Sequence, residues 1–107
     1  MGSERRRAPR FPIIAEAKIT EIASETTLSA RTSDLSVGGC FLDMLNPSPE
    51  GTEIEVRISH AETTFAARGR VVFVFPNMGM GVMFRSVPAS QQAILEKWLA
   101  NLGGDEG

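Results

Sequence analysis

Residues 53–58 read Glu-Ile-Glu-Val-Arg-Ile, so that apolar side chains occupy every second position of this stretch. Successive side chains of a β-strand point to opposite faces, and the alternation therefore predicts a strand with Ile54, Val56 and Ile58 toward a core. Residues 15–20, Ala-Glu-Ala-Lys-Ile-Thr, show the same alternation. Half-buried strands of this kind favour a mainly β protein.

Short apolar stretches continue on both sides of these two strands, with turn signals such as Asn-Pro-Ser-Pro-Glu-Gly (46–51) between them. The further strands that we expect are residues 27–32, 40–42, 64–75 and 79–84. Gly69 interrupts the longest of them, where we expect a bend or a bulge. Many short strands separated by turns are typical of a sandwich or a small barrel.

The last part of the chain has a different period. Apolar residues between 88 and 102 recur at helical spacing, with polar side chains opposite them, so we predict an amphipathic helix that packs on the strands. Gly103 stands where a C-terminal glycine cap is expected. The apolar stripe consists of Ile94, Leu95, Trp98, Leu99 and Leu102.

The length and composition set the class of protein. A chain of 107 residues, 42% hydrophobic and 22% charged, suits one soluble domain with one core. The sequence has no apolar run of the roughly 20 residues that cross a bilayer, and no apolar segment follows the basic N-terminal residues. The single cysteine, Cys40, has no partner for a disulfide or for a cysteine-based metal site. We therefore expect a cytoplasmic protein without membrane insertion.

Charge is distributed unevenly along the chain. Residues 1–10 carry four Arg and one Glu, whereas the remaining residues carry a net charge of −5. We interpret residues 1–10 as a flexible basic arm, 11–102 as a single domain and 103–107 as a frayed tail. A basic arm on an acidic body favours the capture of a small anion over a broad nucleic-acid footprint, so we expect neither DNA nor RNA as a partner.

The first candidate motif is the cluster Arg5-Arg6-Arg7-Ala8-Pro9-Arg10. Guanidinium groups bind phosphate in a bidentate manner, stack on purines and match the O6 and N7 acceptors of guanine. The alternative is a solvated basic tail or an arm that binds phosphates without specificity.

The second candidate motif is Asp34-Leu35-Ser36-Val37-Gly38-Gly39, in a polar stretch (33–39) that we interpret as a loop. A carboxylate can accept hydrogen bonds from N1–H and N2–H of guanine, and Ser36 can bond a neighbouring polar group. Gly38 and Gly39 permit a positive φ and a close approach to a ligand. The alternative is a tight turn in which Asp34 and Ser36 bond their own backbone.

Taken together, Arg-x-x-x-Arg at Arg6 and Arg10 and the following Asp-x-Ser-x-x-Gly resemble the signature of the PilZ domain family. The segments 38–42 and 79–84 are similar to strands of that family, so that the resemblance extends from Arg5 to about Leu102. It implies a six- or seven-stranded antiparallel β-barrel, the PilZ-like split barrel, with a C-terminal helix. It also implies binding of the bacterial second messenger cyclic di-GMP.

By this resemblance, Arg6 and Arg10 hold phosphate and guanine, while the second motif holds a base against the barrel. Arg5 precedes the motif and favours two stacked cyclic di-GMP molecules per chain, and Arg7 is a further phosphate contact. The ligand-binding residues that we predict are Arg5, Arg6, Arg7, Arg10, Asp34, Ser36, Gly38 and Gly39. No other cofactor and no metal are expected.

The function that follows is a stand-alone cyclic di-GMP receptor or adaptor. Ligand binding is expected to order the arm over the barrel and to change the surface that meets a downstream protein. The acidic residues show no paired arrangement for acid–base catalysis, so we do not expect an enzyme. One alternative is a protein–protein scaffold with the same fold that does not use the nucleotide. Another is a small barrel that binds single-stranded nucleic acid.

Other conspicuous residues are expected to be structural. His60 is expected in an exposed turn, and Arg31 is a possible competitor for the ion pair of Asp34. One of two phenylalanines, Phe73 or Phe75, could flank a guanine, but we predict that both are packed in the core. The same packing role is predicted for Met78, Met80, Met83 and Trp98.

Overall fold

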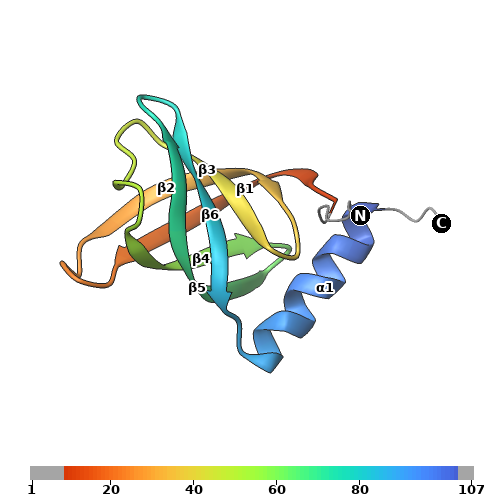
Figure 1. The fold of residues 1–107 in the computed structure, drawn as a ribbon. Coiled ribbons are helices and arrows are strands. Elements are labelled where there is room, and N and C mark those ends of the chain that lie inside the picture. Colours follow the sequence, from red (N-terminus) through yellow and green to blue (C-terminus); the bar gives the residue numbers. More distant parts are fainter. Residues whose placement is uncertain (1–8, 104–107) are drawn as a thin grey trace, which may run out of the picture.

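In the computed structural model, which describes residues 9–103, six antiparallel strands close into a barrel and one helix follows them (Figure 1). The elements are β1 (Phe11–Glu21), β2 (Thr27–Leu35), β3 (Gly39–Asp43), β4 (Glu53–His60), β5 (Thr63–Phe75), β6 (Gly79–Ser86) and α1 (Ala89–Gly103). Around the barrel the order is β1-β2-β3-β6-β5-β4, and β4 pairs back with β1. The predicted mainly β fold and antiparallel barrel are confirmed.

Alternating side chains fill the interior of the barrel. In β4 the side chains of Ile54, Val56 and Ile58 are fully buried, as their spacing predicts. In β1 the inward positions continue through Ala15, Ala17 and Ile19 to the same core. Because each strand has one buried face and closure leaves no unpaired edge, the barrel needs no second sheet.

A bulge near the start of β1 is the main irregularity of the β1–β2 pair. The register between these strands shifts between Pro12 and Ala15. Thr32 is fully buried opposite the bulge, where its Oγ1 accepts from the Ala15 N–H and donates to the Ile13 carbonyl, both at 3.0 Å. The hydroxyl thus supplies hydrogen bonds that the interrupted ladder lacks. On the N-terminal side of the bulge, Pro12 pairs with Asp34.

The helix α1 packs on the outside of the barrel, against β5 and β1. Its Leu95 and Trp98 are buried, as the apolar stripe predicts. The Trp98 ring lies 6.1 Å from that of Phe65, and the Gln91 side-chain oxygen accepts a hydrogen bond from a β5 backbone N–H at 2.7 Å. Among the described residues, no helix has the length and apolar character that a membrane crossing requires.

Gly103 does not form the predicted left-handed cap. It is the last residue of α1, and of the glycines in residues 9–103 only Gly51 has a positive φ. A Cβ at Gly103 would lie 3.3 Å from the Phe11 ring, so glycine here permits close packing of the helix end against the start of β1.

The strands extend further than the sequence predicts, and two of these extensions shorten an expected loop or turn. β2 continues to Leu35, because Asp34 and Leu35 pair with both β1 and β3, so the loop comprises only residues 36–38. β4 continues to His60, which lies half-buried with its ring edge-on to Trp98 at 5.2 Å rather than in an exposed turn. The β4–β5 turn is therefore only two residues long, and both adopt a positive φ, which suits a tight hairpin.

A second polar contact lies at the C-terminal end of β1. The Glu21 carboxylate accepts hydrogen bonds from Ser48 Oγ at 2.5 Å and from Ser24 Oγ at 2.9 Å. These two donors, Ser48 first, lower the pKa of Glu21 below its ordinary value. Ser48 is buried, so the contact joins the long β3–β4 connection to the end of β1.

We expect Thr32→Val to lower the free energy of unfolding by about 1–3 kcal/mol, because the isosteric change leaves a buried N–H and carbonyl without a partner. Urea unfolding followed by circular dichroism measures the change. Thr32→Ser keeps the hydroxyl and is the matched control, which is expected to lose less. A valine variant as stable as the wild type would contradict the role given to this hydroxyl.

We expect Ser48→Ala to lower stability at pH 7 by about 1 kcal/mol or less, because the Glu21 contact lies near the surface. A lowered folded-state pKa stabilises the protein above the unfolded pKa, and this contribution disappears as pH falls through the folded pKa. The difference between variant and wild type should therefore shrink below about pH 4. Urea midpoints from pH 3 to pH 7 test this. A stability difference between variant and wild type that grows as the pH falls would contradict this role of the Glu21 carboxylate.

Candidate functional site

The two sequence motifs meet where β1 enters the barrel. Arg10 Nη2 donates to Asp34 Oδ1 at 3.0 Å, and Arg10 Nε donates to Oδ2 at 3.4 Å. The side chains are 52% and 31% exposed, respectively. An ion pair this exposed contributes little to stability. The backbone pairing of Pro12 in β1 with Asp34 in β2 therefore sets the position of the two side chains. The pair is therefore accessible to a ligand that competes for either partner.

Arg31 is not the partner of Asp34. It lies across the strands from Glu16 and Asp43, and among the ion pairs of residues 9–103 Asp34 pairs with Arg10. The prediction that Arg31 competes for Asp34 is wrong, because the strand register places Arg31 between two other carboxylates, Glu16 and Asp43, while Arg10 pairs with Asp34.

Ser36 stabilises the loop that carries the second motif. Its hydroxyl oxygen lies 3.2 Å from both the Gly38 and the Gly39 N–H, and its own N–H donates to the Gly39 carbonyl at 2.8 Å. The side chain is buried. This is the tight-turn arrangement that we considered as the alternative for Ser36, whereas the Asp34 carboxylate faces Arg10 instead of its own backbone.

The two glycines of the motif have different surroundings. A Cβ at Gly39 would lie 2.1 Å from the Val82 carbonyl oxygen of β6, so only glycine fits where β3 and β6 approach. A Cβ at Gly38 would meet nothing within 4 Å, and the Gly38 carbonyl accepts from the Phe84 N–H at 2.8 Å. Neither glycine adopts the positive φ that the absence of a side chain permits. Gly39 thus holds the loop against β6, and Gly38 faces open space.

A shallow depression of about 200 Å³ lies between this loop and β6. Arg10, Gly38, Phe73 and Met83 are among the residues that line it. Cys40 also borders it but is fully buried, and burial, followed by the charge of Asp34, raises the pKa of its thiol to about 12. The thiol is therefore protonated at neutral pH and does not act as a nucleophile.

An exposed aromatic cluster adjoins the depression, where the sequence predicted core residues. Phe73 and Phe75 are 39% and 50% exposed, and both rings lie within 6.0 Å of the half-buried Phe41 ring. A Cβ at Gly81 in β6 would lie 2.2 Å from the Phe73 ring, so the ring covers this glycine. The Gly-x-Gly of β6 beside Phe-x-Phe of β5 is the sequence signal for this arrangement.

The predicted packing of the methionines is only partly correct. Met80 is fully buried, whereas Met78 and Met83 are exposed. Met83 follows an inward position of β6 and thus points outward toward the depression. The predicted ligand residues Arg5, Arg6 and Arg7 lie outside the described residues. Within residues 9–103, no group of three or more histidine, cysteine or acidic side chains is arranged to hold a metal ion.

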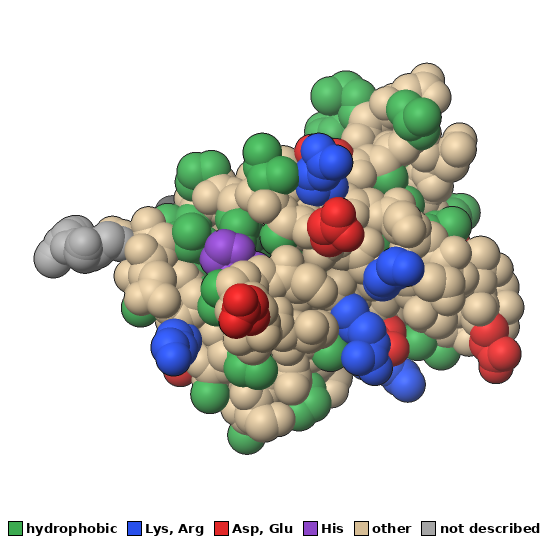
Figure 2. All heavy atoms as spheres, turned by 180° about the vertical axis from the view of Figure 1, so that it is seen from behind, with side chains coloured by type: hydrophobic (Ala, Val, Ile, Leu, Met, Phe, Trp, Pro, Cys, Tyr) green, Lys and Arg blue, Asp and Glu red, His purple; other side chains and the backbone are tan. Residues whose placement is uncertain are grey.

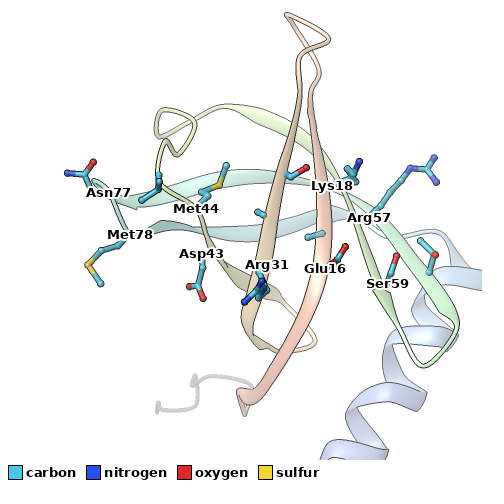
Figure 3. Close-up of a pocket in the computed structure, with 14 residues that line it drawn as sticks. Glu16, Lys18, Arg31, Asp43, Met44, Arg57, Ser59, Asn77 and Met78 are labelled. Carbon is cyan, nitrogen blue, oxygen red and sulfur yellow. The ribbon is translucent and has the colours of Figure 1, made fainter.

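A larger hollow, of about 780 Å³, lies elsewhere on the barrel (Figure 3). It crosses the outer face of β3, β2, β1, β4 and the start of β5, and none of the predicted ligand residues within 9–103 lines it. Size alone therefore does not identify the site at which the two motifs meet.

A family model for the PilZ domain matches residues 4–101. The chain belongs to the PilZ domain family. The matched segment includes both motifs and every described strand, so the resemblance seen in the sequence is confirmed as family membership. A search of curated proteins finds no match.

Solved structures share this fold, and two of those given below are PilZ domains. The inhibitor of motility MotI/DgrA of Bacillus subtilis superposes with a TM-score of 0.79 at 15% identity, over 98% of this chain and 54% of that protein. The present chain thus spans about half of that relative. The PilZ domain of YcgR from Escherichia coli, solved with c-di-GMP, gives a TM-score of 0.76 at 18% identity, over 94% of this chain and 92% of the other. The PilZ domain of CeSA from a cellulose-synthesizing bacterium gives 0.69 at 17% identity, over 94% of this chain and all of the other.

The two motif glycines provide a matched pair for mutagenesis. We expect Gly39→Ala to lower the free energy of unfolding by about 1–3 kcal/mol or more, because the new Cβ collides with the β6 backbone. Gly38→Ala meets open space and should leave stability within about 0.5 kcal/mol of the wild type. Thermal or urea unfolding of both variants measures the difference, and equal losses would show that the β3–β6 approach is not the constraint.

Proposed function

We propose that this PilZ protein is a receptor for cyclic di-GMP that binds at the Arg10–Asp34 pair. The observation that carries the proposal is that β1–β2 pairing brings the ends of the two motifs into contact beside the loop of Gly38 and the depression. The PilZ domain of YcgR, which has the same fold, was solved with this ligand.

The site offers complementary groups to a guanine nucleotide. The Asp34 carboxylate can accept from guanine N1–H and N2–H, and in the free protein Arg10 occupies it. A ligand that takes over the carboxylate releases the Arg10 guanidinium to bind a phosphate or to stack on a base. Gly38 admits the ligand closely, and the exposed edge of Phe73 supplies an apolar contact for a base.

The arm completes the proposed site. In this proposal Arg5, Arg6 and Arg7 contact phosphates and bases, Arg5 lies on a base of a stacked pair of ligand molecules, and the arm closes over them on binding. Stacking of a base contributes about 1–3 kcal/mol, part of which is offset by ordering of the arm. The closed arm changes the surface that a downstream protein meets, so the chain acts as a cytoplasmic adaptor rather than an enzyme.

One observation favours the alternative of a protein scaffold that does not use the nucleotide. The Phe41, Phe73 and Phe75 cluster is an apolar surface of the kind that binds other proteins. Nucleic-acid binding has less support, because on the face in Figure 2 positive and negative side chains lie interspersed and form no broad basic area. The receptor and the scaffold differ in whether the Arg10–Asp34 pair is used.

Isothermal titration calorimetry with cyclic di-GMP tests the receptor proposal. We expect saturable binding to the wild type, weakened about tenfold or more in both Arg10→Ala and Asp34→Asn, because each removes a charge-assisted hydrogen bond to the ligand. Arg31→Ala, three residues before Asp34 in β2, removes an arginine that does not pair with Asp34 and should bind as the wild type does. The stoichiometry distinguishes one ligand from a stacked pair. A folded wild type that binds no cyclic di-GMP would exclude the receptor and leave the scaffold.

A further inference from the structure

The larger hollow is a groove that runs from the end of β3 across β2, β1 and β4 to the start of β5 (Figure 3). Its floor lies at Ala17 and Ala30, which are partners in the β1–β2 register and whose side chains pack against the core. Side chains that point away from the core stand along the groove in two rows. The groove is thus an open channel of about 780 Å³ with a backbone floor.

One row balances its own charges. Glu16 of β1 lies opposite Arg31 of β2, which in turn lies opposite Asp43 of β3. The signs alternate, so each charge has an opposite charge on the neighbouring strand. Cross-strand pairs of opposite charge are mildly stabilising, and this row needs no partner to offset its charge.

The other row carries a net positive charge. Lys18 of β1 lies directly opposite Arg57 of β4, and like charges in this position are destabilising. Arg57 forms an ion pair with Glu55 of the same strand at 3.6 Å, whereas Lys18 forms no ion pair within residues 9–103. Two neighbouring basic side chains on a chain of net negative charge form a local site that can bind a carboxylate of another molecule.

The far end of the groove is apolar. Leu45 and Met78 are 72% and 65% exposed, and both line the groove together with Met44. The Met44 N–H donates to the Met78 carbonyl at 2.9 Å, so the two loops that carry these side chains are held together. Neighbouring exposed apolar side chains on loops of fixed geometry are typical of a binding surface.

We propose that the groove docks an extended segment of a partner protein that carries acidic residues at one end and an apolar anchor at the other. The carboxylates contact Lys18 and Arg57, and the anchor packs on Leu45 and Met78. A nucleic acid fits less well, because the opposite row presents the Glu16 and Asp43 carboxylates to its phosphates and the apolar end finds no phosphate partner. This surface shares no lining residue with the depression beside Arg10 and does not depend on the nucleotide.

A phage-displayed library of random twelve-residue peptides tests the proposal on the full chain, with the Lys18→Glu/Arg57→Glu double variant as the counter-selection target. We expect the enriched peptides to combine Asp or Glu residues with Leu, Met or an aromatic residue. A synthetic enriched peptide should bind the double variant about tenfold or more weakly by fluorescence anisotropy, because each reversed charge repels its carboxylates. Leu45→Ser/Met78→Ser should weaken it as well.

The control reverses the same number of charges outside the groove, in Arg68→Glu/Arg85→Glu, and should bind the peptide as the wild type does. Circular dichroism establishes that each variant is folded. Peptides without acidic residues, equal binding to the charge-reversed groove, or no enrichment over the double variant would overturn the proposal. If a fluorescein-labelled oligothymidine binds the wild type but not the double variant, the ligand of the groove is a nucleic acid and not a protein segment.

Discussion

The hydroxyl of Thr32, buried against the bulge in β1, is the contact on which the geometry of the molecule depends. From Glu16 onward β1 pairs with both β2 and β4 and closes the barrel. Before the bulge it pairs with β2 alone. A bulge bends a strand and re-aims the residues beyond it, and here it directs Arg10 to Asp34. Assembly of the site therefore depends on this irregular step in β1 together with the register shift between Thr32 and Asp34 in the β2–β3 pair.

The barrel separates stability from recognition by its two faces. The inward side chains, Ile54, Phe65 and Met80 among them, form one dry core. The outward side chains form the Arg10 depression, the aromatic cluster and the groove across β2, β1 and β4. Because outward substitutions in a closed barrel do not disturb the core, each outer surface can change independently of the fold. This explains how relatives at 15–18% identity retain TM-scores of 0.69–0.79.

Period-two alternation predicted the strands well, because in β1 and β4 it reflects burial on one side of the sheet. It failed where composition and burial disagree. Phe73 and Phe75 are apolar but lie outside, and Phe73 covers Gly81 of β6, which the sequence of β5 alone does not show. Asp34 is polar but belongs to a strand, since pairing on both sides of β2 is a long-range property. The two motifs identified Arg10 and Asp34 as candidate ligand residues. Their contact depends on a register shift between β1 and β2, which cannot be predicted from the sequence.

Backbone-amide chemical shifts of ¹⁵N-labelled protein during titration with cyclic di-GMP test the central claim most directly, because they locate the ligand on the barrel. A ligand at the Arg10–Asp34 pair should shift the amides of Asp34, Gly38 and Phe73 in a saturable manner and leave Ala17 and Ala30, at the floor of the groove, unchanged. Shifts confined to the groove, or no saturable shifts from a folded protein, would contradict it.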